Sequence, residues 1–128
     1  MPGGTITVDV RATFAAMLVM SVSEKMVFGT DQPEITKAGE RKYTAELAVT
    51  FHAENGMRAV SEVIPVTITG GDHQAVLSIP PGSVVQLDRL RCGVSAPERK
   101  DNGRISGGKP FWMASGIRVT SRPAEKAS

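Results

Sequence analysis

The sequence predicts an all-β domain whose five main strands close into a barrel. Segments that alternate between apolar and polar residues recur along the chain, as expected of strands with one buried face. Only one helical candidate falls within the set of five strands, and it lies between the third and the fourth. The length of 128 residues fits a single domain, and a hydrophobic content of 41% with 22% charged residues is typical of a folded, soluble protein.

The apolar N-terminal part of the chain permits two interpretations. Residues Thr5–Val10 alternate and are expected to form a half-buried strand or arm. Alanine and methionine permit a helix over Arg11–Met20, whereas the alternation that starts at Leu18 favours a strand. We therefore place the first main strand at residues 17–28 and a turn-rich connection at residues 29–41.

The middle of the chain predicts a hairpin followed by a short helix. Residues 42–52 alternate more regularly than any other segment and form the second strand. The Asn55-Gly56 pair predicts a tight turn into the third strand at 57–69, where Pro65 marks an edge or a bulge. Residues Asp72–Ile79 are expected to form a helical turn or two, with the aspartate as N-cap. The buried face of the second strand is expected to hold Tyr43, Ala45, Leu47, Val49 and Phe51.

The C-terminal third predicts two more strands and a second long connection. Strands at 84–94 and 111–120 flank residues 95–110, a glycine-containing loop. The tail at 121–128 has the composition of a disordered terminus. Residues 1–120 are therefore expected to form one domain with an N-terminal arm.

This order of elements is that of the OB-fold, a five-stranded Greek-key barrel with a helix after its third strand. The two long connections, at 29–41 and 95–110, join strands 1–2 and 4–5, and these are the loops that line the ligand face in OB-folds. A β-sandwich would use more strands at more even spacing. The sequence therefore predicts an OB-fold barrel with one short helix between strands 3 and 4.

Charge is distributed unevenly along the chain. Residues 1–88 hold 6 Lys+Arg against 10 Asp+Glu, a net of −4, and residues 89–128 hold 9 against 3, a net of +6. A basic segment of this kind is typical of proteins that bind a polyanion, although a solvated loop has the same composition. We expect phosphate contacts at Arg89, Arg91, Arg99, Lys100, Arg104, Lys109 and Arg118.

Trp112 opens the last strand and is the main candidate for stacking on a base. By the alternation of residues 111–120, Trp112 lies on the face of its strand opposite to Phe111, Met113, Ile117 and Val119 and is expected to face outward. A base could then stack on the indole ring, and the alternative is a tryptophan covered by the loop or the arm. Phe28 and Tyr43 flank the first long connection as candidate second platforms, although the phase of Tyr43 matches that of a core residue.

Four segments of the chain stand out as a set: Met26–Phe28, Lys42–Leu47, Pro81–Val85 and Trp112–Val119. Their order and spacing over residues 5–120 resemble small OB-fold, single-stranded-DNA-binding-like proteins of actinobacterial plasmids and integrative elements. The resemblance implies single-stranded nucleic-acid binding in replication, recombination or transfer. The chain differs from ordinary bacterial single-strand binding proteins because it lacks a long acidic, glycine-rich tail and has few aromatic residues. The resemblance therefore does not imply general coating of single strands.

The sequence does not predict an enzyme. His52 and His73 are far apart, and no cysteine or acidic cluster accompanies them at metal-ligand spacing, so neither a metal nor another cofactor is expected. No glycine-rich phosphate loop stands between a strand and a helix. The single cysteine, Cys92, excludes an intrachain disulfide and favours a cytoplasmic location. The longest apolar run is too short to span a bilayer, so no membrane partner is expected.

Two classes of function fit this sequence. The first is non-catalytic binding of single-stranded DNA or RNA in a basic groove. The second is a β-barrel module without nucleic-acid binding, which contacts another protein or pairs with a second copy through a groove or a strand edge. Salt separates the two classes, because phosphate binding weakens steeply with salt and strand pairing does not.

Overall fold

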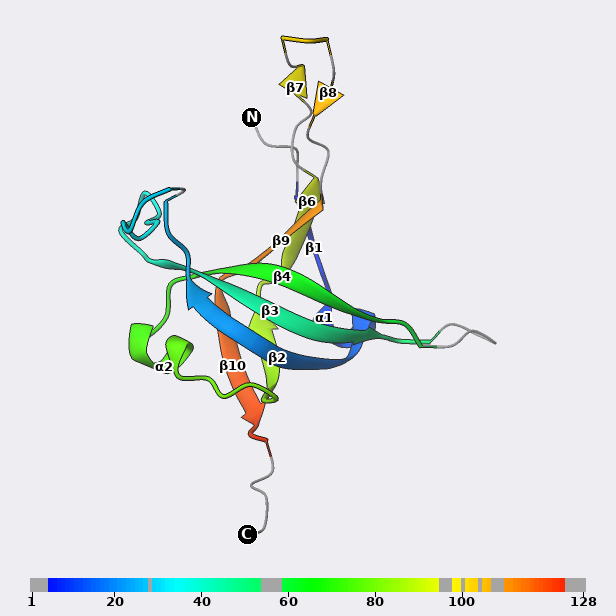
Figure 1. Cartoon of the computed structure of the whole chain (residues 1–128). Helices are drawn as coiled ribbons and strands as arrows, with labels where there is room; N and C mark the ends of the chain where they lie inside the picture. The colour runs from blue at the N-terminus through cyan, green and yellow to red at the C-terminus, as the bar shows by residue number, and fades with distance from the viewer. Residues whose placement is uncertain are drawn as a thin grey trace.

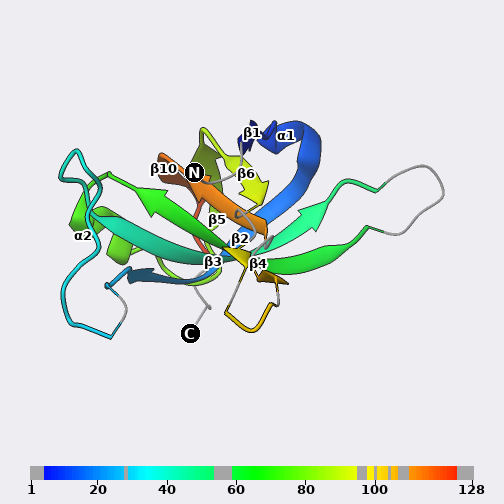
Figure 2. The ribbon, with the colours of Figure 1, turned by 90° about the horizontal axis from the view of Figure 1, so that it is seen from above.

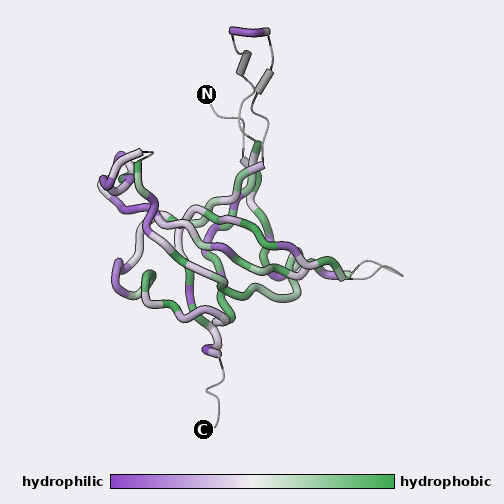
Figure 3. Tube along the Cα trace, in the orientation of Figure 1, coloured by the Kyte–Doolittle hydropathy of each residue, from purple (hydrophilic) through white to green (hydrophobic). Residues whose placement is uncertain are grey.

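The structure is a computed structural model that describes residues 5–27, 29–53, 59–94, 98–99, 101–103, 105–106 and 110–123. The all-β class is confirmed, because strands make up most of the described chain and the two helices are short. The sheet occupies the centre of Figure 1, with the arm formed by β7 (Glu98–Arg99) and β8 (Ile105–Ser106) above it and α2 (His73–Leu77) at its lower side. Figure 3 shows hydrophobic residues along the sheet and hydrophilic residues at the loop 29–41 and at the tip of the arm.

Eight of the ten strands form one sheet, in the order β1-β6-β9-β4-β3-β2-β5-β10. β4 and β9 are parallel, and the other neighbours are antiparallel. β7 and β8 pair only with each other. The elements are β1 Thr5–Thr7, α1 Val10–Thr13, β2 Phe14–Glu24, β3 Lys42–Phe51, β4 Ser61–Thr69, α2 His73–Leu77, β5 Val84–Asp88, β6 Arg91–Val94, β7 Glu98–Arg99, β8 Ile105–Ser106, β9 Pro110–Ala114 and β10 Gly116–Ser121.

The N-terminal segment differs from the sequence prediction in two ways. β1 is exposed along its whole length rather than half-buried, since it pairs only with β6 at the end of the sheet. The helix permitted over Arg11–Met20 is limited to α1, which Asp9 caps by accepting a hydrogen bond from the backbone N–H of Ala12 at 3.1 Å. It ends where Phe14 turns extended and pairs with Phe51 of β3, so the first main strand starts at 14 rather than 17.

β3 forms the centre of the core, as its regular alternation predicts. Four of the five expected inward residues are at most 1% exposed, and Phe51 packs against the core from its rim. β2 and β4 flank β3 and run beside it across the molecule (Figure 2). Pro65 lies in β4 just before the short segment Val66–Ile68 that pairs with β9. It therefore has one hydrogen-bonded neighbour, β3, as expected of a proline at a sheet edge.

The predicted helix between the third and fourth main strands is confirmed as α2. The side chain of Asp72 accepts a hydrogen bond from the backbone N–H of Gln74 at 3.0 Å, so Asp72 is the N-cap. Val76 is buried against the core. The predicted Asn55-Gly56 turn lies outside the described residues.

The last two predicted strands are each broken in the middle. The run 84–94 divides into β5 and β6 at Arg89, whose φ of 51° is left-handed, and the buried Leu90 follows. The run 111–120 divides into β9 and β10 at Ser115, whose backbone N–H donates to the carbonyl of Asp88 at 2.9 Å. The two breaks therefore lie side by side, and each shifts the inward phase by one residue. The inward residues are Val85, Leu87, Leu90 and Cys92 on one run, and Trp112, Ala114, Ile117 and Val119 on the other.

β10 extends one residue into the tail predicted at 121–128. Ser121 still belongs to β10, where it pairs with Val84 after a register shift. Arg122 and Pro123 are exposed beyond the strand. The rest of the predicted tail, 124–128, lies outside the described residues.

Candidate nucleic-acid interface

Trp112 faces the core, so the prediction of an outward indole is wrong. It stands beside Val66, which is fully buried, and its ring centroid lies 6.0 Å from that of Phe14. The side chain is half-buried and packs against the core cluster. The error arises at Ser115, because an unbroken alternation from Ile117 back to residue 111 crosses a break that reverses the phase.

Phe111 takes the outward position instead, although the sequence assigned it to the core. Alternation in β9 sets Phe111 and Met113 on the face opposite to Trp112, and both are half-buried. Across the β6–β9 ladder, Phe111 pairs with Gly93 and Met113 pairs with Arg91. A glycine opposite an aromatic ring leaves the ring uncovered on that side. We call these four residues the β6–β9 outer face.

Arg89 and Arg91 lie in different elements, although both fall within the single strand predicted at 84–94. Arg89 is exposed in the left-handed bend between β5 and β6, whereas Arg91 lies in β6 itself. Arg91 is exposed and has Met113 on one side and Thr7 of β1 on the other. Of the two arginines, only Arg91 is therefore placed on a strand beside an outward apolar side chain.

Arg118 is exposed on β10, a strand that pairs only with β5 among the described strands. Its guanidinium donates to Oδ1 of Asp88 from Nε at 3.2 Å and from Nη2 at 3.0 Å. The pair is largely solvated, so it contributes little to stability, but it neutralises much of the local charge. The structure therefore does not bring Arg118 together with Arg91.

Most of the predicted loop cations fall where the structure says nothing of their side chains. Arg99 belongs to β7, opposite Ile105 of β8, and its side chain is not described. The segment leaves β6 at Val94 and re-enters the sheet at Pro110, next to Phe111. The segment therefore starts and ends at the two strands of the β6–β9 outer face (Figure 1). Lys100, Arg104, Lys109 and the aromatic candidate Phe28 lie outside the described residues.

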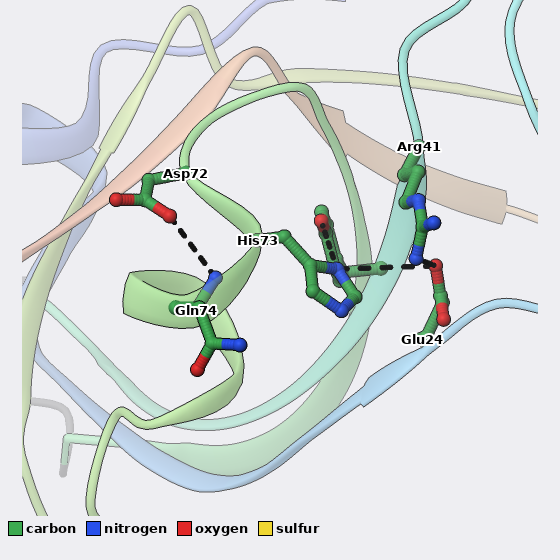
Figure 4. A network of polar contacts seen from close by, with 6 residues as sticks. Glu24, Arg41, Asp72, His73 and Gln74 are labelled. Carbon is green, nitrogen blue, oxygen red and sulfur yellow. Dashed lines mark hydrogen bonds and ion pairs between the residues drawn. The ribbon is translucent and has the colours of Figure 1, made fainter.

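Tyr43 is a core residue, as its phase in β3 favours, and not a platform for bases. It is 1% exposed, and a 3.0 Å hydrogen bond joins its hydroxyl to Nδ1 of His73 in α2. Burial raises the pKa of Tyr43, and the nearby carboxylate of Glu24 adds to that rise. Oε2 of Glu24 also accepts from Nη1 of Arg41 at 3.0 Å and lies 4.0 Å from Nδ1 of His73 (Figure 4). The network joins α2 to the ends of β2 and β3.

The first long connection is electrically balanced, unlike the second. Residues 25–41 hold 3 Lys+Arg and 3 Asp+Glu, whereas residues 95–110 hold 4 and 2. Glu34 accepts a hydrogen bond from Nζ of Lys42 at 3.0 Å and lies 3.9 Å from Nζ of Lys25. The hydrogen bond from Lys42 is the main reason that the pKa of Glu34 lies below its usual value. The second connection therefore carries the larger net charge, +2 against 0 (4 − 2 against 3 − 3).

Neither histidine belongs to a metal site within the described chain. Nε2 of His52 is 2.8 Å from the carbonyl oxygen of Arg11, and His73 is bound to Tyr43. No group of three His, Cys, Asp or Glu side chains among the described residues is arranged to hold a metal ion.

None of the helices that the structure describes is long and apolar enough to cross a membrane. No family model matches the chain, and no curated protein matches it at a significant level.

Proposed function

We propose that this protein binds single-stranded nucleic acid, without catalysis, on the β6–β9 outer face. The observation that carries the proposal is the pairing of Phe111 with Gly93 beside Arg91, at the base of a connection with net positive charge. A half-exposed ring supplies a stacking surface that accepts any base, and arginine supplies a phosphate contact. Both groups are fixed on paired strands, which lowers the entropy lost on binding.

The strand pairings support the further proposal of an OB-type barrel. β5 and β6 are consecutive halves of one run, and β5 pairs with β2 while β6 pairs with β9. The main strands thus follow one another as first, second, third, fifth and fourth, and the fourth also touches the first. The parallel β4–β9 pair and the helix after β4 agree with the same fold. In such a barrel, the connections 25–41 and 95–109 border the ligand face.

The experiment is a titration of fluorescein-labelled oligothymidylate with the full chain over a series of salt concentrations. Binding should be measurable at low salt and should weaken steeply as salt rises, because phosphate contacts release counterions. A double-stranded oligonucleotide of matched length is the control and should bind less tightly, since its bases cannot reach Phe111. Absence of binding at low salt, or equal affinity for the duplex, would overturn the proposal.

A second candidate, a protein-interaction or self-assembly module, is favoured by a separate observation. Leu18, Ala48 and Val63 stand side by side on β2, β3 and β4, and the outer two are 39% and 54% exposed. An apolar row of this kind across a sheet is typical of a contact surface. Concentration-dependent association that persists at high salt, without oligonucleotide binding, would favour this candidate. A role in the replication or transfer of a mobile element stays a prediction from the resemblance alone.

A further inference from the structure

A groove of about 450 Å³ lies between α2 and β10, away from the β6–β9 outer face. One wall is the segment from Gly70 to Pro80, and the other is formed by β10 with Ser115 and Arg122 at its ends. The apolar part of the lining comes from Val76 and Ile79 on the first wall and from Ile117 and Val119 on the second. Figure 1 shows α2 beside β10 in the lower part of the molecule, with the arm at the top. The groove is therefore a separate place from the proposed nucleic-acid interface.

The β10 wall of the groove presents backbone N–H and C=O groups as well as side chains. β10 ends the hydrogen-bonded order of the sheet and pairs with β5 on one side. Alternate N–H and C=O groups of such a strand point away from its neighbour and can pair with an added strand. Gly116 lets the Asp88 side chain pack closely against this strand, because a Cβ there would lie 2.9 Å from Oδ2 of Asp88. On the opposite wall, Gly71 has a left-handed φ of 94° that disfavours a side chain.

The charges of the groove are separated along its length. Two hydrogen bonds place the acidic residues of the groove near the start of β10. The hydroxyl of Thr69, three residues before Asp72, donates to the carbonyl of Ala114 at 3.5 Å, and the backbone N–H of Ser115 donates to the carbonyl of Asp88. The hydrogen bonds that the structure gives these two carboxylates all go to Oδ1, from Gln74 and from Arg118. Asp88 is already paired with Arg118, so Asp72 is the groove carboxylate to which a further cation is attracted. Arg122 lies at the far end of the strand, next to Pro123, which packs near Gly82.

We propose that this groove binds an extended peptide segment of a partner protein, which adds to β10 as a further strand. A lysine or arginine of the peptide meets Asp72, and an apolar side chain next to it packs between Val76 and Ile117. The backbone pairing supplies affinity, and the Asp72 carboxylate with the apolar walls supplies selectivity. The proposal does not depend on nucleic-acid binding.

The experiment selects binders from random linear peptides displayed on phage, with the full chain as bait. Enriched peptides should contain a basic residue followed by alternating β-branched residues. Replacing Ala75, which lines the groove on exposed α2, by Trp should fill the groove and lower their affinity at least tenfold. The matched control Gln74→Trp, exposed on the same helix outside the groove, should leave affinity unchanged. No enriched peptide, or equal binding to Ala75→Trp, would overturn the proposal.

A second measurement tests the charge and the strand pairing without filling the groove. Asp72→Asn keeps an oxygen acceptor for the backbone N–H of Gln74, so the fold is retained. It should weaken an enriched basic peptide severalfold, whereas Glu62→Gln, exposed on β4, should not. In the wild type, the bound peptide should slow amide hydrogen exchange in Gly116–Ser121. Slower exchange elsewhere with no change in β10 would contradict strand addition. Oligothymidylate affinity should be the same in Ala75→Trp, which separates this site from the nucleic-acid interface.

Discussion

Phe111 can accept a base because its ring stands across from a residue without a side chain. Phe111→Ala should therefore weaken oligothymidylate binding by roughly 1–3 kcal/mol, the usual contribution of one base stacked on an aromatic ring. Fluorescence anisotropy at constant salt measures the change. Leu18→Ala removes an exposed apolar side chain from β2 and is the control, with unchanged affinity expected. Equal affinities of Phe111→Ala and the wild type would remove the stacking surface from the proposal.

Trp112 has the opposite role, since it connects β9 to Phe14 at the N-terminal end of β2. Trp112→Ala should lower the free energy of unfolding by about 3 kcal/mol, at the lower end of the range for large core residues because the indole is half-buried. Urea unfolding followed by circular dichroism measures the loss. Phe111→Ala should cost less, because Phe111 lies on the other face of the strand. The reverse order of the two losses would show that the faces of β9 have been assigned the wrong way round.

Tyr43 makes the free energy of unfolding depend on pH in the alkaline range. Its folded pKa lies above the ordinary value of 10.0, so the folded state holds the phenol proton more tightly than the unfolded state does. The resulting stability is complete below about pH 10 and is lost as pH rises through the folded pKa. Tyr43→Phe should abolish this part of the alkaline decline and, at neutral pH, should cost about 1 kcal/mol for the bond to His73. Urea titrations near neutrality and above pH 10 compare the two proteins, and identical alkaline slopes would contradict the prediction.

The sequence predicts an element of this fold well where the interactions that form the element lie within a few residues of one another. The alternation of β3 and the Asp72 cap of α2 depend on near neighbours in sequence, so both could be found without a structure. The breaks at Arg89 and Ser115 could not, because an arginine carries no signal for a left-handed φ and the bond from Ser115 to Asp88 spans 27 residues. Gly116, directly after the break, is the one local hint.

The reversed faces of β9 follow from those two breaks, and so does the exchange of Phe111 for Trp112 in the candidate site. The exposure of Arg91 on a strand could be predicted from the sequence, because a charged side chain on a strand generally faces solvent. Its separation from Arg118 was not foreseeable, since it depends on which strands pair. The groove at β10 was missed for the same reason: its walls come from segments that meet only in the folded chain.

The bend between β5 and β6 is a strained element that can be relaxed. A non-glycine residue in the left-handed region costs roughly 1–2 kcal/mol, and a glycine regains that at some cost in chain entropy. Arg89→Gly should therefore raise the free energy of unfolding by about 0.5–1 kcal/mol. The control Arg91→Gly, in the adjoining strand β6, should lower it by a similar amount, because glycine weakens a strand interior. Thermal unfolding compares the variants, and a loss of stability in Arg89→Gly would show that its side chain has a structural role.

Four cations of the chain lie in the connection 95–110, and we expect them to determine how nucleic-acid binding depends on salt. Replacing Arg99, Lys100, Arg104 and Lys109 together by Ala should weaken oligothymidylate binding at low salt and flatten its salt dependence. Stability should change little, because exposed charges contribute little to it. Arg11→Ala removes an exposed cation from α1 and should leave the salt slope unchanged. An unchanged slope in the fourfold variant would favour the protein-interaction candidate.

The break at Ser115 decides which side chains of the last run face the core. Ala114 and Ile117 both face inward with two residues between them, so the run holds one residue more than an unbroken alternation would. If Ser115 were drawn into the strand with Ile117 held in the core, the alternation would turn Phe111 inward and Trp112 outward. Deleting Ser115 would instead join β9 and β10 in one alternation that keeps Trp112 inward. A change in the length of the connection from Val94 to Pro110 affects neither ring, since each doubling of a flexible loop costs only about 0.6 kcal/mol. The last run can therefore lose its extra residue, but it cannot absorb that residue without exchanging the two aromatic rings.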